Sequence, residues 1–136
     1  YIRDLFAARA AIEPAAVRWG AFADAPSLVT LTSSAFDYAA RGEHQEVSAI
    51  NQRFHRTLVA ALGSPTLNEQ MDNLLARMRL TFLLAIPRYP QLHADHIQGN
   101  ITLATLIADG KRLEAATLSH DSLMNTCEKI LAVLDD

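Results

Sequence analysis

The residues best suited to binding chemistry are Asn51 and His55, which lie four apart in an apolar helical pattern. Side chains at this spacing share one face of a helix, and Phe54 and Leu58 predict that this face points into the protein. A buried polar group left without a partner costs about 1–3 kcal/mol, so each needs a hydrogen bond or a ligand. Two interpretations stay open: a structural hydrogen bond between helices, or a ligand or metal site.

Three more polar residues fall on the apolar faces of other predicted helices. Arg9 lies on the inner face of the first helix, where Glu13, four residues later, could pair with it. Asn100 lies among isoleucines of a later helix, and His120 lies on the apolar stripe of the last one. Singly, each fits a structural role. Together, helices that each present a polar side chain inward favour a binding pocket inside a bundle.

A denser group, His93, Asp95 and His96, is a weaker indication of a metal site. It follows Pro87 and Pro90, and we favour a solvated helix start at this point. The sequence contains no GxSxG, HExxH, P-loop or GxGxxG motif, and no carboxylate pair lies in an evident apolar pocket. We therefore expect no catalytic residues and no enzyme activity.

Helices must position all of these side chains. Apolar residues recur at three- and four-residue steps, and Gly42, Gly63 and Gly110 mark stops between the segments. The pattern predicts six helices, at about residues 2–22, 26–41, 43–62, 65–86, 93–108 and 113–134. Because the connections are short, we expect an all-α, antiparallel bundle of about six helices.

Composition fits this expectation and excludes several functions. The chain has 136 residues, half of them hydrophobic, which suits one domain with a single core over residues 1–136. Its net charge is −3 and no basic run is present, so we expect DNA contact only through another domain. Cys127 is the single cysteine, and the apolar run at 80–86 is too short to span a bilayer. We expect a cytoplasmic protein with no membrane contact.

The order of motifs resembles the FCD family, the C-terminal domains of FadR-like GntR transcription regulators. Residues 6–14 resemble its opening pattern of arginine, then glutamate four residues later, then proline. Residues 51–55 resemble its Asp-x-x-x-His motif, and residues 63–67 its Gly-Asn-Pro-x-Leu motif. Residues 100–110 resemble its His-x-x-Ile-x-x-Ala-Ile-x-x-Gly segment. The resemblance covers almost the whole chain and implies an FCD-type bundle.

In many members of this family an aspartate and three histidines hold a divalent metal beside a carboxylate effector. This sequence departs from that set, because Asn51 replaces the aspartate and Asn100 replaces a histidine. The last histidine is either His120, after a small shift, or is replaced by Ser122. Only His55 matches directly. Neutral amides are poor ligands for transition metals, so we assign no metal residues and no cofactor, and keep a divalent metal as the alternative.

The resemblance implies a sensing and dimerisation domain. We expect a small metabolite, an organic acid, to be held by Arg9, Asn51, His55, Asn100 and His120, with the Arg9 guanidinium on the anionic group. A homodimer and a winged helix-turn-helix domain upstream of Tyr1 are expected on the same ground. The alternatives are a purely structural dimerisation module without a ligand, and a helical-bundle metalloprotein.

Overall fold

The structure, a computed structural model, describes residues 1–134, and in that range every regular element is a helix. The elements are α1 (Ile2–Trp19), α2 (Ala25–Ser33), α3 (Ala35–Ala40), α4 (His44–Ala60), α5 (Pro65–Ala85), the short 3-10 helix η1 (Ile86–Arg88), α6 (Leu92–Ala108) and α7 (Arg112–Leu134). The predicted all-α helical bundle is confirmed. No helix among the described residues has both the length and the apolar character needed to cross a membrane.

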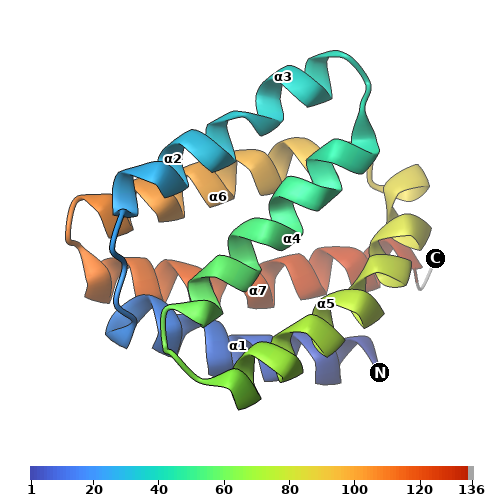
Figure 1. The fold of residues 1–136 in the computed structure, drawn as a ribbon. Coiled ribbons are helices and arrows are strands. Elements are labelled where there is room, and N and C mark those ends of the chain that lie inside the picture. Colours follow the sequence, from blue (N-terminus) through green and yellow to red (C-terminus); the bar gives the residue numbers. More distant parts are fainter. Residues whose placement is uncertain (135–136) are drawn as a thin grey trace.

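The second predicted helix is divided into two segments. α2 and α3 lie end to end (Figure 1), with Ser34 between them. The hydroxyl of Thr32 donates to the carbonyl of Leu28 (2.8 Å), and that of Ser34 donates to the carbonyl of Leu31 (2.6 Å). Such side chains compete with backbone N–H groups for helical carbonyls, which is why a helix often breaks at them. The six predicted helices therefore correspond to seven α-helical segments in the described residues.

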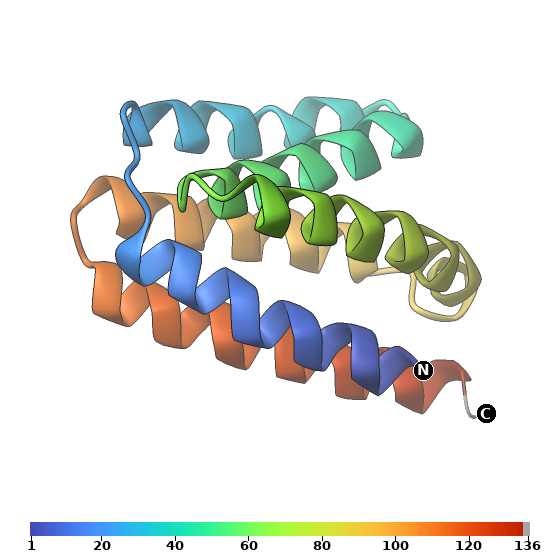
Figure 2. The ribbon, with the colours of Figure 1, turned by 60° about the horizontal axis from the view of Figure 1, so that its bottom comes forward.

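The helices pack in pairs, and α4 crosses between the pairs. α1 lies along α7, and α2 with α3 runs along α6 (Figures 1 and 2). Phe6, Met78 and Ile130 belong to the core cluster that joins α1, α5 and α7. Phe54 and Ile107 belong to a second cluster, where α4 meets α6. Burial of these apolar side chains brings α1, α4, α6 and α7 together and leaves polar side chains between them.

A close backbone contact fixes α1 against the end of α4. The N–H of Ala21 donates to the carbonyl of Ala61 (2.9 Å). A Cβ atom on Gly20 would lie 2.5 Å from the Ala16 carbonyl oxygen and 2.7 Å from Ala61 Cβ, so only glycine allows this approach. The guanidinium of Arg112, at the start of α7, donates to the carbonyls of Val17 and Gly20. These hydrogen bonds fix the positions of α1, α4 and α7 relative to one another, and so the positions of the polar residues that they carry.

Candidate functional site

A cavity of about 160 Å³ lies among α1, α4, α6 and α7, and we call it the central cavity. It is lined by Phe6, Arg9, Asn51, His55, Phe82, Tyr89, Asp95, His96, Gly99, Asn100, Leu103, Ser119, Ser122, Leu123, Asn125, Thr126 and Lys129. Four of the five predicted ligand-binding residues, Arg9, Asn51, His55 and Asn100, are in this set. The structure therefore brings together side chains that the sequence separates by up to about ninety residues.

A buried ion-pair cluster forms one wall of the central cavity. The Arg9 Nε donates to Glu13 Oε2 (2.6 Å), and its Nη2 makes a longer contact with Oε1 (3.4 Å). His55 Nδ1 donates to the same Glu13 Oε1 (2.6 Å) from α4. The Arg9 and Glu13 side chains are only 3% and 1% exposed. The structural pairing of Arg9 with Glu13 is confirmed, and Glu13 also joins α1 to α4.

The cluster keeps Glu13 ionised. Burial raises the pKa of this carboxyl, but the charges and hydrogen bonds of Arg9 and His55 outweigh that effect and lower its pKa to about 2. Glu13 therefore carries a full negative charge at neutral pH and balances the charge of Arg9.

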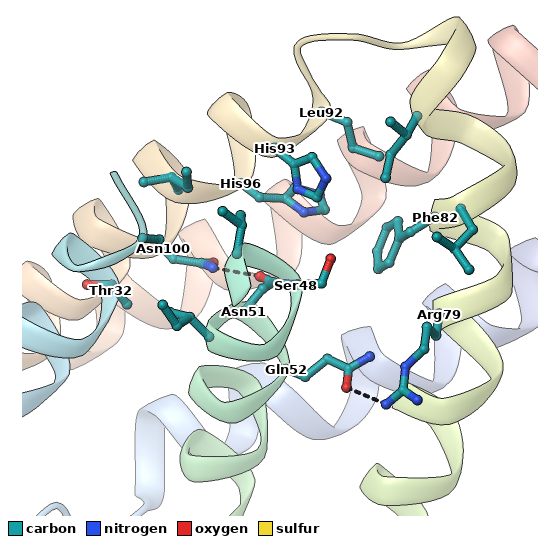
Figure 3. Close-up of a pocket in the computed structure, with 16 residues that line it drawn as sticks. Thr32, Ser48, Asn51, Gln52, Arg79, Phe82, Leu92, His93, His96 and Asn100 are labelled. Carbon is teal, nitrogen blue, oxygen red and sulfur yellow. Dashed lines mark hydrogen bonds between the residues drawn. The ribbon is translucent and has the colours of Figure 1, made fainter. Parts of the chain in front are cut away.

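Asn51 and Asn100 are bonded to each other across the cavity wall. Asn100 Nδ2 donates to Asn51 Oδ1 (2.7 Å), which links α6 to α4 (Figure 3). Both side chains are partly buried. The inter-helix hydrogen bond that we considered for Asn51 and His55 is thus present at both residues. The same side chains also line a cavity, so the structural and the binding interpretations are compatible.

His96 is a site residue that the sequence analysis set aside as part of a solvated helix start. It lies one helical turn before Asn100 on α6, lines the central cavity, and contacts the Phe82 ring edge-on (5.1 Å between centroids). Burial, followed by the nearby charges of His55 and Arg9, lowers its pKa to about 3, so the ring is neutral. The predicted solvated helix start is wrong for His93 and His96, which are both partly buried. The spacing of 96 and 100, which repeats that of 51 and 55, was the available signal.

The prediction that His120 faces inward is wrong. Its side chain is 54% exposed, contacts Asp121 (3.1 Å) and does not line the central cavity. The buried stripe of α7 instead runs through Ala115, Ser119, Leu123, Cys127 and Ile130. Leu113, at the start of the predicted last helix, is exposed as well, so the inferred apolar stripe was rotated around the helix axis. Ser119 and Ser122 are the cavity residues in this part of α7.

The donor atoms present here do not fit the metal site that the family resemblance implied. The two amides are bonded to each other and are poor ligands for a transition metal, so His55 is the one imidazole that remains of the family's set. Ser122 offers only a hydroxyl at the remaining position. Among residues 1–134, no group of three or more histidine, cysteine or acidic side chains is arranged to hold a metal ion. Hydrogen bonding and charge must therefore explain what this cavity can do.

Comparison with known proteins gave one match. The family model of the FCD domain matches residues 4–125, which is most of the chain and includes all residues that line the central cavity except Thr126 and Lys129. No curated protein and no solved structure matches the chain.

Proposed function

Because the chain belongs to the FCD domain family, the C-terminal effector-binding module of FadR-like GntR regulators, we propose that its central cavity binds a small organic acid. Binding serves regulation and not catalysis. The observation that carries the proposal is the convergence of Arg9, Asn51, His55 and Asn100 on one cavity. Pockets of this kind, formed by polar side chains from facing helices, are a usual binding site in bundles.

The acid group is held mainly by hydrogen-bond donors. Arg9 bonds Glu13 through Nε and Nη2, and among the described residues no group accepts a hydrogen bond from its Nη1. Nη1 is therefore the donor we assign to a ligand carboxylate, and such charge-assisted bonds are the strong ones. The Asn51 amide N–H groups and the hydroxyls of Ser119 and Ser122 supply weaker donors around it. A cavity of about 160 Å³ suits an acid of only a few carbon atoms.

Regulation follows from the position of the cavity. Its walls come from α1, α4, α6 and α7. A ligand that hydrogen-bonds to both Arg9 and Asn100 therefore stabilises one arrangement of these helices more than another. In the full-length cytoplasmic protein, this change is transmitted to an upstream winged helix-turn-helix domain, which makes the DNA contacts.

We include a second copy of the chain as a partner. On α5, Leu80 and Leu84 are 64% and 59% exposed, an unusual state for leucines only four residues apart on a helix. Burying them against a partner subunit would stabilise a homodimer. Light scattering of Leu80→Ser with Leu84→Ser should show a monomer, whereas Leu113→Ser, at an exposed leucine of α7, should leave the dimer intact. A monomeric parent protein would refute this part of the proposal.

A purely structural role is the second candidate, and a specific observation favours it. His55 and Asn51 already have partners, Glu13 and Asn100, and so have no unmet need for a ligand. Under this alternative, no acid binds and the cavity contains only water.

Calorimetric titration with a panel of two- to six-carbon carboxylic acids, each with its amide as a neutral control, separates the two candidates. We expect at least one acid to bind and its amide to bind at least about tenfold more weakly, which corresponds to about 1.4 kcal/mol. Ser122→Phe, which places a ring at the cavity wall, should abolish binding. His120→Phe introduces the same ring at an exposed site on α7 outside the cavity and should not.

The outcomes are distinct. If no acid of the panel binds, the structural module is supported. If an acid binds equally to Ser122→Phe and the parent protein, its site lies elsewhere and the assignment to the central cavity is wrong.

A further inference from the structure

A second cavity lies between the first half of α4, the end of α5 and the start of α6. We call it the outer cavity; its volume is about 370 Å³. It is lined by His44, Ser48, Gln52, Arg79, Leu83 and His93, among others, and by none of the four predicted residues that line the central cavity. Its volume exceeds that of the central cavity and lies in the range of small-molecule sites.

Arg79 gives the outer cavity a positive charge that no acidic side chain balances. Its Nη2 donates to Gln52 Oε1 (2.8 Å), so a neutral amide holds the guanidinium in place between α5 and α4 (Figure 3). No carboxylate among residues 1–134 forms an ion pair with Arg79, whereas Arg9, Arg41 and Arg56 each have one. No carboxylate lines the cavity either. A guanidinium without a counter-ion is well suited to an anion.

The histidines supply a second polar wall. The rings of His44 and His93 stack with 5.2 Å between centroids and 14° between planes. His93 Nε2 is buried and has no hydrogen-bond partner among the described residues. Burial and the neighbouring His44 lower the pKa of His93, so its ring is neutral at pH 7 and can donate one N–H. A buried ring nitrogen without a partner is uncommon and calls for an explanation, such as a ligand group.

We propose that the outer cavity is a second ligand site, which binds a small organic anion with its carboxylate or phosphate group on Arg79. Ser48 and the imidazole pair supply the remaining polar contacts, and Leu83, Ala49 and Ile86 receive the apolar part of the ligand. The site shares no lining residue with the central cavity, and a smaller cavity of about 40 Å³ is lined by residues of both, among them Asn51, Arg79 and His93. The outer cavity is near enough to influence the central cavity, because Gln52, which holds Arg79, directly follows Asn51 on α4.

The test uses benzoate as the probe, with benzamide as the neutral control and phenyl phosphate as the alternative anion. Amide chemical shifts of the chain, in its native oligomeric state, are followed by NMR during each titration. We expect benzoate to shift amides of residues 44–52, 79–86 and 93, and benzamide to produce no saturable shift. If phenyl phosphate binds more tightly than benzoate, the ligand carries a phosphate group. If benzoate binds more tightly, the ligand carries a carboxylate.

Arg79→Gln should weaken binding of the anion at least about tenfold, because it removes a charge-assisted hydrogen bond. Arg77→Gln makes the same change on the same helix, at a residue that contacts Tyr1 and does not line the cavity, and should leave binding unchanged. His93→Ala is a second variant in case Arg79→Gln does not fold, and it should also weaken binding. Binding that survives both Arg79→Gln and His93→Ala would overturn the proposal, as would shifts confined to residues around Arg9 and Ser122.

Discussion

His96 makes the stability of this domain sensitive to mild acid. The pKa of its imidazole falls from an ordinary 6.5 to about 3 on folding, because burial and the charges of His55 and Arg9 disfavour the charged ring. Between these two values the unfolded chain binds a proton that the folded chain does not. The free energy of unfolding therefore has its full value above about pH 6.5 and decreases as the pH falls towards 3. At about pH 4.5, two units below 6.5, the loss reaches about 3 kcal/mol.

The assay is urea unfolding at about pH 7 and about pH 4.5, for the parent protein and for His96→Asn, whose amide does not titrate. The free energy of unfolding should fall between the two pH values by about 3 kcal/mol more in the parent than in the variant. This window lies above the range in which Glu13 titrates, since its pKa is lowered from 4.5 to about 2. His120→Asn is the control at an exposed histidine and should behave as the parent. Equal pH dependence in the parent and His96→Asn would refute the reasoning.

Two further predictions concern the packing of α1. Glu13→Gln should lower the free energy of unfolding at about pH 7 by about 3–5 kcal/mol in urea titrations, because Arg9 keeps a buried charge without its partner. Since the pKa of Glu13 is lowered, this contribution to stability is present above about pH 4.5 and is lost as the pH falls towards 2. A Glu13→Gln variant as stable as the parent at pH 7 would contradict the prediction. Gly20→Ala should lower the melting temperature, because its Cβ would clash with the Ala16 carbonyl. Gly99→Ala, where a Cβ would meet nothing, should instead be neutral or raise stability by up to about 1 kcal/mol, and equal effects at both glycines would be evidence against the close contact.

The helices and four site residues were predictable because local rules determine them. Apolar periodicity located the helices, and the Gly63-Ser64-Pro65 corner is as expected: Gly63 has φ +69° and Ser64 Oγ accepts from the N–H of Leu67 (3.2 Å). A polar residue between apolar neighbours on a helix predicts burial, which correctly placed Arg9 and Asn100.

Other parts of the site depend on packing between helices, which periodicity does not contain. Periodicity could not show that Glu13 bonds His55 across two helices, because the contact joins residues forty-two apart. The α7 helix has apolar side chains around much of its circumference, so its sequence admitted more than one inward stripe and His120 was placed wrongly. His96 was set aside because the two prolines before it suggested a solvated segment, whereas its ring contacts Phe82 of α5 and is partly buried.

Native mass spectrometry with the tightest-binding acid of the panel tests the central claim most directly. The account predicts a homodimer without metal, in which one acid per subunit is lost in Ser122→Phe and retained in His120→Phe. A subunit mass that includes a transition metal would contradict the claim that this donor set does not fit a metal. An acid-free mass at saturating acid would contradict the account and leave the structural dimerisation module as its replacement.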